Sequence, residues 1–128
     1  TAGTPTIERT WEAWRMEDRP RFAPAHFWSE VANGLRQRGQ SRSEEVVRRL
    51  AVLRTIGIDA IDRGQRGLEE AAYLAERHGL SVYDALYLQL AIEVDGTLAT
   101  HDRALAAAAT VELVDLEPVG AGPVGDEI

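Results

Sequence analysis

The segment from Ser81 to Ile92, with the sequence SVYDALYLQLAI, constrains the fold most. A helix with this sequence carries apolar side chains on nearly every side, so other elements must cover almost all of its surface. Its one charged residue, Asp84, falls in the first turn, where burying a carboxylate is costly unless something stabilises the charge. The chain must therefore build a core around this helix and stabilise one acid near its start.

Strand-like and helical patterns alternate through the second half of the chain, which is typical of βα units around a parallel sheet covered on both faces. The sequence therefore predicts the α/β class. We expect Ser41 or Ser43 to cap one helix and Gly79 to end another. The expected helices span about 5–16, 24–38, 43–53, 65–78, 81–94 and 102–109, and the expected strands span about 21–23, 56–61, 97–100 and 111–116.

The 128 residues suffice for one compact core and leave little room for a second. We expect one domain over residues 1–119 and a flexible tail over residues 120–128, where glycine and proline dominate. No apolar stretch approaches the roughly 18 residues of a membrane helix, and the first residues show no signal-peptide pattern. We therefore expect a soluble, cytoplasmic protein.

Cysteine and lysine are both absent, and each absence excludes a class of chemistry. Without cysteine the chain has no disulfides, no thiolate zinc site and no cysteine nucleophile. Without lysine it is neither a P-loop enzyme nor a Schiff-base enzyme. Any metal must be held by oxygen ligands or by the three histidines, which favours hard cations such as Mg²⁺.

The net charge of −7 is unusual for a protein that binds nucleic acid, but the charges are unevenly distributed. Of the 14 arginines, 13 precede Gly79, and the last 50 residues hold nine acids against Arg103 alone. Between Arg36 and Arg54 six arginines face only two glutamates. This run is either a solvated helix face or a surface that contacts phosphates beside an acidic pocket.

Three acids are candidates for a metal site, and each also has a purely structural interpretation. Asp84 follows Ser81 by three residues, so it either completes a capping box or ligates a metal at the start of the helix. Asp102 either caps the next helix or lies at the carboxyl end of a strand, where parallel sheets bind ligands. Glu30 is either a surface residue or a third ligand beside an apolar helix face.

Three stretches of the chain resemble a PIN domain, specifically the VapC-like toxin ribonucleases of toxin–antitoxin modules. They are APAHFWSEVANGL at 23–35, LSVYDALYL at 80–88 and LATHDRAL at 98–105. The resemblance implies a three-layer α/β/α fold with a short central parallel sheet. It also implies a Mg²⁺- or Mn²⁺-dependent endoribonuclease in which Glu30, Asp84 and Asp102 are the catalytic, metal-binding acids and Thr100 supports the site. A homodimer and a cognate antitoxin are implied as well.

RNA and antitoxin would each need contact residues of their own. Arg36, Arg38 and Arg42 are our candidates for contacts to the RNA backbone. Trp11 and Trp14 lie three residues apart on an otherwise polar helix, so they either pack in the core or form a ridge that an antitoxin binds.

The chain departs from the family pattern at its start. The family begins with an apolar strand that ends in the first catalytic aspartate, followed by a helix. This sequence starts TAGTP and leads directly into what resembles the second helix. We therefore expect the 128 residues to lack that strand and helix and to be inactive by themselves. The alternative is a catalytically inactive PIN-like module that binds a partner.

Overall fold

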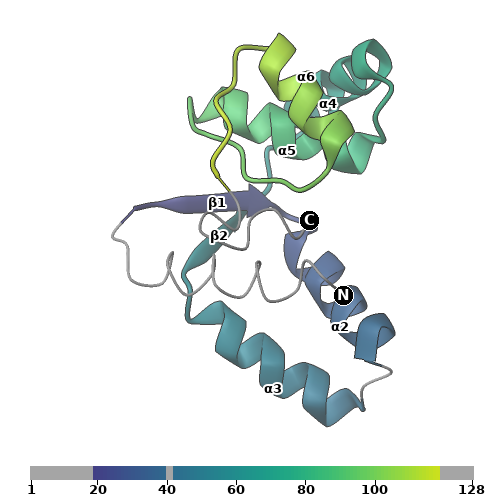
Figure 1. Cartoon of the computed structure of the whole chain (residues 1–128), viewed down its shortest axis with the longest axis vertical. Helices are drawn as coiled ribbons and strands as arrows, with labels where there is room; N and C mark the ends of the chain where they lie inside the picture. Colours follow the sequence, from purple (N-terminus) through teal and green to yellow (C-terminus); the bar gives the residue numbers. More distant parts are fainter. Residues whose placement is uncertain (1–18, 40–41, 119–128) are drawn as a thin grey trace. The chain divides into compact units, whose positions relative to one another are not determined.

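Residues 19–39 and 42–118 are described by the computed structural model of the chain (Figure 1). These residues form two compact units, one ending at Ile61 and the other beginning at Asp62. The mixed α/β class predicted from the sequence is confirmed. The elements are β1 (Arg21–Pro24), α2 (Phe27–Gly39), α3 (Ser43–Arg54), β2 (Ile58–Ile61), α4 (Gly64–His78), α5 (Val82–Glu93) and α6 (Arg103–Val111).

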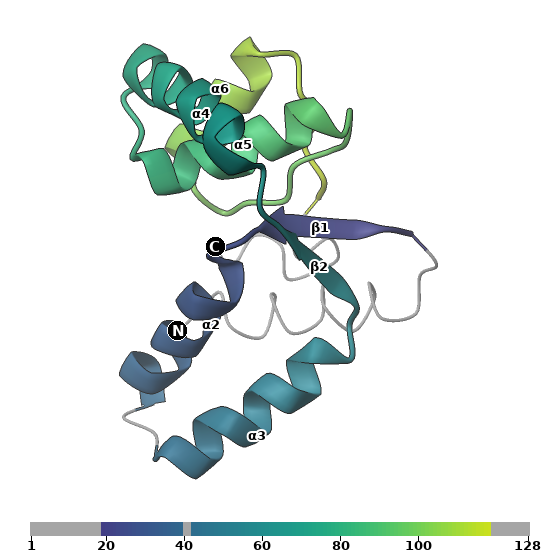
Figure 2. The ribbon, with the colours of Figure 1, turned by 180° about the vertical axis from the view of Figure 1, so that it is seen from behind.

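The first unit consists of two parallel strands joined by a helical hairpin. Strand β1 pairs with β2 in parallel, with Arg21 opposite Ile58 and Pro24 opposite Ile61. Parallel strands need a long crossover connection, and α2 and α3 supply it. Figure 2 shows α2 leaving the end of β1 and α3 leading into β2.

The hairpin is held by partly buried apolar faces rather than by a deep core. Phe27, Val31 and Leu35 recur every four residues along α2, and all three are half-buried. No residue of α3 is fully buried. The expected serine cap is wrong for Ser43, which is the first helical residue; Arg42 is the N-cap and makes no side-chain cap bond, while Ser41 lies outside the described residues.

The second unit contains α4, α5 and α6 packed around a small-residue core. Ala71, Ala85, Leu88 and Ala109 are completely shielded from solvent. Alanines at these positions let the helix backbones approach closely, which explains how short helices can cover α5. The predicted burial of the 81–92 segment is confirmed for its centre, residue 85 and residues 88–91, whereas Tyr83 and Ile92 are exposed. Gly79 ends α4 as expected, with a left-handed φ of 66° and its N–H donated to the Ala75 carbonyl.

The helices and strands predicted for residues 21–94 are present to within a few residues, but the last strand is largely wrong. We expected a strand over 111–116, whereas α6 continues to Val111 and a turn follows it. In that turn Leu113 adopts a left-handed φ of 64°, and the Val114 N–H donates to the Ala109 carbonyl. These bonds use the backbone groups that a strand would need.

Only one parallel bridge remains of the strands expected over 97–100 and 111–116. It pairs Leu98 with Leu116. The Leu98 N–H donates to the Asp115 carbonyl at 2.9 Å, and the Glu117 N–H donates to the Leu98 carbonyl at 2.8 Å. Residues 99–102 connect Leu98 of this bridge to the start of α6.

The helix expected over 5–16 lies outside the described residues. Within 19–39 and 42–118, none of the helices combines the length and hydrophobicity that a bilayer-spanning segment requires.

Candidate active site

Asp84 lies in the first turn of α5, where the residue before the helix caps it. The Ser81 hydroxyl oxygen accepts a hydrogen bond from the Asp84 N–H at 3.0 Å, so the predicted N-cap is confirmed. The reciprocal bond of a capping box, from the Ser81 N–H to the Asp84 carboxylate, is not formed. Among the described residues the half-buried Asp84 carboxylate has no hydrogen bond and no ion pair. The cap therefore gives the Asp84 N–H a partner but leaves the negative charge of its carboxylate without one among the described residues.

Asp102 is the N-cap of α6, and its carboxylate is oriented by the backbone. Its Oδ1 accepts a hydrogen bond from the Leu105 N–H at 2.9 Å. The Thr100 hydroxyl accepts from the Asp102 N–H at 3.0 Å. Thr100 thus holds the backbone that carries the acid, and its role in supporting a site stays a prediction. The side chain of Asp102 is exposed, and Oδ2 takes no part in the cap.

Glu30 lies in the first turn of α2, in the other unit. Its Oε1 is 3.5 Å from Nε2 of His26, one helical turn earlier, and its side chain is 48% exposed. The His26 side chain is mostly buried beside it. Glu30 therefore combines an accessible carboxylate with a neighbouring imidazole.

The structure brings Asp84 and Asp102 into one unit, each at the amino end of a helix, and leaves Glu30 in the other unit. Within the described part of the chain, no three acidic or histidine side chains are grouped so as to hold a metal ion. The convergence of all three acids stays a prediction. Their chemistry fits a hard divalent cation, because such ions prefer oxygen ligands and the Asp84 carboxylate has no described partner that would neutralise it.

The charged residues are distributed unevenly between the two units. Residues 19–61 hold eight arginines and four acids, whereas residues 62–118 hold four arginines and eleven acids. The predicted RNA contacts belong to the basic unit, and the acids Asp84 and Asp102 belong to the acidic one. Residues 19–61 therefore carry a net positive charge, although the whole chain is negative.

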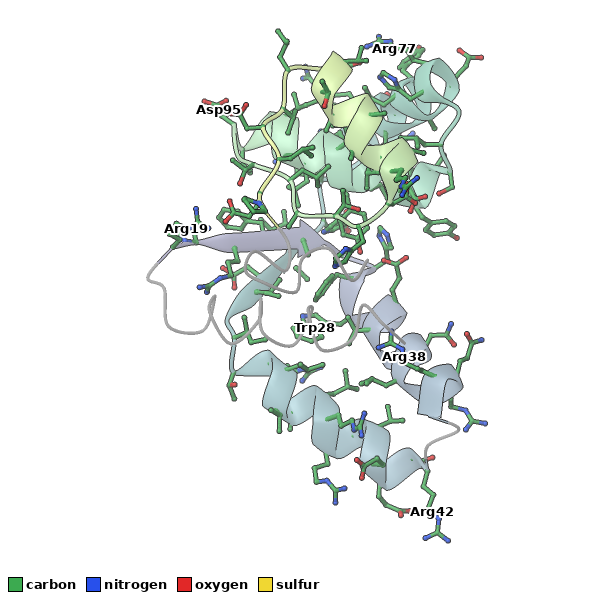
Figure 3. All side chains as sticks on the ribbon, viewed as in Figure 1. Arg19, Trp28, Arg38, Arg42, Arg77 and Asp95 are labelled. Carbon is green, nitrogen blue, oxygen red and sulfur yellow. The ribbon has the colours of Figure 1, made fainter. Side chains whose placement is uncertain are left out.

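The arginines of the hairpin fall into two groups. Arg48 and Arg49 both pair with Glu45, and the Arg54 guanidinium lies 5.8 Å from the ring of Trp28. By contrast, the three predicted RNA contacts are exposed and form no ion pair with any described residue; they are Arg36, Arg38 and Arg42. These three lie at the end of α2 and the start of α3, around the tip of the hairpin (Figure 3).

Trp11 and Trp14, the predicted antitoxin contacts, lie outside the described residues. The third tryptophan, Trp28, packs edge-on against Phe27 with ring centroids 5.0 Å apart. Its contacts with Phe27 and Arg54 give this ring a packing role within the hairpin.

Two acids away from the candidate site have shifted titration. The hydrogen bond from Gln89, followed by that from Arg66, lowers the pKa of Glu70. The hydrogen bond with His78, followed by that from Arg77, lowers the pKa of Glu112. Both acids are stabilised in their charged form by neighbours within their own unit, so these shifts reflect packing of the helices.

The Gln89 contact was missed in the sequence. Gln89 is only 2% exposed, and its Nε2 donates to Glu70 Oε1 at 2.9 Å. The available signal was a single amide side chain in the middle of an otherwise apolar helix.

Comparison with known proteins adds one finding. A family model described as PIN domain matches residues 4–111, a range that includes all three candidate acids and Thr100. No protein with curated function is matched.

Proposed function

The chain belongs to the PIN domain family, whose members are generally nucleases, and we propose that it is a divalent-metal-dependent endoribonuclease. We propose further that it is the toxin of a toxin–antitoxin module, that it is active as a homodimer, and that an antitoxin inhibits it. The observation that carries the nuclease proposal is the Asp84 carboxylate, which stands at the start of a buried helix without a described partner.

Asp84, Asp102 and Glu30 are the residues that would hold Mg²⁺ or Mn²⁺. The chemistry that a bound divalent cation supplies in such a site is activation of the attacking water and neutralisation of charge on the phosphate. Carboxylates suit this task because they are ionised at neutral pH and offer hard oxygen ligands.

The backbone prepares Asp102 for that role. The bond from Leu105 engages Oδ1 and the bond to Thr100 holds the residue's own N–H, so the carboxylate is restricted before any ligand arrives. Restricting a ligand in advance reduces the entropy lost when the site forms. Thr100 is therefore a positioning residue in this proposal.

The exposed arginines at the tip of the hairpin supply the contacts to RNA phosphates. Arg36, Arg38 and Arg42 have no described acidic partner to displace, so each can pair with a phosphate without first breaking an ion pair. Arg48 and Arg49 would first have to leave Glu45.

The experiment that tests the nuclease proposal compares two matched substitutions. Asp84→Asn removes the candidate charge, and Asp95→Asn removes a charge from an exposed turn in the same unit, where a left-handed φ of 52° suits asparagine. In a chain that also carries the family's first strand and aspartate, we expect Asp84→Asn to abolish metal-dependent RNA cleavage and to weaken Mn²⁺ binding in calorimetry. Asp95→Asn should change neither.

Cleavage that survives Asp84→Asn would contradict the assignment of this acid. A chain that includes that strand and binds a partner protein, but neither binds Mn²⁺ nor cuts RNA, would favour the catalytically inactive partner-binding module instead.

A further inference from the structure

Tyr83 is largely exposed, although the centre of its helix is buried. Its neighbours Ala85 and Leu88 are completely buried, whereas Tyr83 itself is 66% exposed. The ring therefore contributes little to the core around α5. An exposed aromatic ring offers a flat face on which a nucleobase can stack.

The position of Tyr83 in the chain ties this ring to the candidate active site. It directly precedes Asp84, in the same first turn of α5. Consecutive Cα atoms are only about 3.8 Å apart, so an RNA strand bound at Asp84 also passes the residue that carries the ring. The exposed ring and the carboxylate without a described partner are thus two independent observations at one end of one helix.

We propose that Tyr83 is a stacking platform for a nucleobase next to the phosphate that Asp84 serves. This inference rests on the proposed nuclease function and adds a subsite to it. Single-stranded RNA is recognised largely by stacking of unpaired bases on aromatic side chains. Because every base has a flat face, the subsite selects for single strands rather than for one base.

The strandedness of the substrate follows from this subsite. In a duplex the bases are stacked on one another, so a ring can receive one only after the duplex opens locally. Tyr83 should therefore contribute to the binding of single-stranded RNA and contribute nothing to the binding of a stable hairpin stem or duplex.

The test uses equilibrium binding of the full chain in Ca²⁺, followed by the fluorescence anisotropy of a labelled, mixed-sequence single-stranded RNA. Tyr83→Ala should weaken binding by about tenfold, the size expected for loss of one stacked base. Tyr83→Phe should bind like the wild type, because it keeps the aromatic face. Tyr73→Ala is the matched control, since Tyr73 is 71% exposed and lies on α4 rather than on α5.

Two further ligands separate stacking from loss of structure. A duplex of the same sequence should bind wild type and Tyr83→Ala equally, and so should an abasic oligomer that keeps the phosphates but lacks the bases. Equal weakening for all three ligands would show that the substitution damages the fold or a phosphate contact, and would overturn the proposal.

The remaining outcomes distinguish this inference from the proposed function. If the wild type cuts RNA in an Asp84-dependent way and Tyr83→Ala binds single strands normally, the stacking subsite is wrong and the nuclease assignment stands. If the wild type does not bind RNA, both fail together.

Discussion

The Nε2 atom of His78, at the end of α4, lies 2.7 Å from Oε2 of Glu112, which caps the end of α6. Arg77 donates from Nη1 to the same oxygen, also at 2.7 Å. The His78 and Glu112 side chains are largely shielded from solvent. One carboxylate oxygen thus joins the ends of two helices that are more than 30 residues apart in the chain.

This contact between the ends of α4 and α6 makes the stability of the fold depend on pH in the acidic range. Because the hydrogen bonds lower the pKa of Glu112 in the folded protein, its contribution is present above the ordinary glutamate pKa of about 4.3 and is lost as the pH falls through the lowered value. Glu112→Gln should cost about 1 kcal/mol of unfolding free energy at pH 7, and the difference from wild type should shrink below about pH 4. Urea unfolding across that range measures it.

The exposed Glu76 on α4 supplies the control for this series, because it makes no described contact. Glu76→Gln should leave the pH dependence unchanged. A Glu112→Gln protein as stable as wild type at pH 7 would show that the contact contributes nothing.

At the start of α5, we expect Ser81→Ala to lower the stability of the fold and Asp84→Asn not to lower it. Ser81→Ala removes the cap that accepts the Asp84 N–H, so we expect a loss of about 1 kcal/mol in thermal or urea unfolding. Asp84→Asn keeps that cap and removes only a carboxylate without a described partner, so stability should stay the same or rise. Strong destabilisation by Asp84→Asn would reveal a structural role for the charge.

Gly79 should resist replacement for a backbone reason alone. A Cβ at this position would meet no atom within 4 Å, so any cost of Gly79→Ala comes from the left-handed φ of 66°. We expect a loss of about 1–2 kcal/mol in unfolding free energy. Gly79→Asn should lose less, since asparagine tolerates this conformation, and equal losses for both would contradict this explanation.

Gly67 should resist replacement for the opposite reason, which is space. Alanine normally stabilises a helix interior relative to glycine by roughly 0.5–1 kcal/mol. A Cβ at Gly67 would overlap the Cβ of Arg63, so Gly67→Ala should instead destabilise the protein. A higher melting temperature for this variant would show that the start of α4 adjusts freely.

The hairpin arginines should set the salt dependence of RNA binding. Replacing Arg36, Arg38 and Arg42 by glutamine should reduce the slope of log affinity against log salt by about 2, the value for three phosphate contacts on a single strand. The matched pair Arg48→Gln and Arg49→Gln should change the slope less, because Glu45 already neutralises these side chains in part. Equal effects of the two sets would argue against contacts at the tip of the hairpin.

Most helices and strands were predictable because a short stretch of sequence is enough to indicate each of them. The apolar run 81–92 allowed only a buried helix, and Gly79 marked a helix end that requires a left-handed residue. The strand expected over 111–116 failed because Leu113 takes the left-handed position that glycine or asparagine usually fills, so no residue type announced the turn.

The places of Asp84 and Asp102 at the starts of their helices were predictable, but the arrangement of the candidate acids was not. Helix starts and strand ends identified Asp84 and Asp102 as capped acids, and the structure confirms their caps. Which side chains meet across long stretches of chain depends on tertiary packing, and sequence spacing carries no measure of it. For the same reason nothing in the sequence pointed from His78 to Glu112, although the two are in contact.

Gln89 has a consequence for how α5 is aligned along α4. Its amide is the one buried polar side chain among the described residues, and it meets Glu70 at one place on the neighbouring helix. A slip of α5 by one turn would move the amide against apolar neighbours and leave it unbonded, so alternative registers are penalised even though alanines and leucines could repack. Asp84 lies on the same rigid helix five residues earlier. The position of Asp84 relative to α4 therefore depends on Gln89. A substitution that removes the Gln89 hydrogen bond would let Asp84 shift, although Asp84 itself is unchanged.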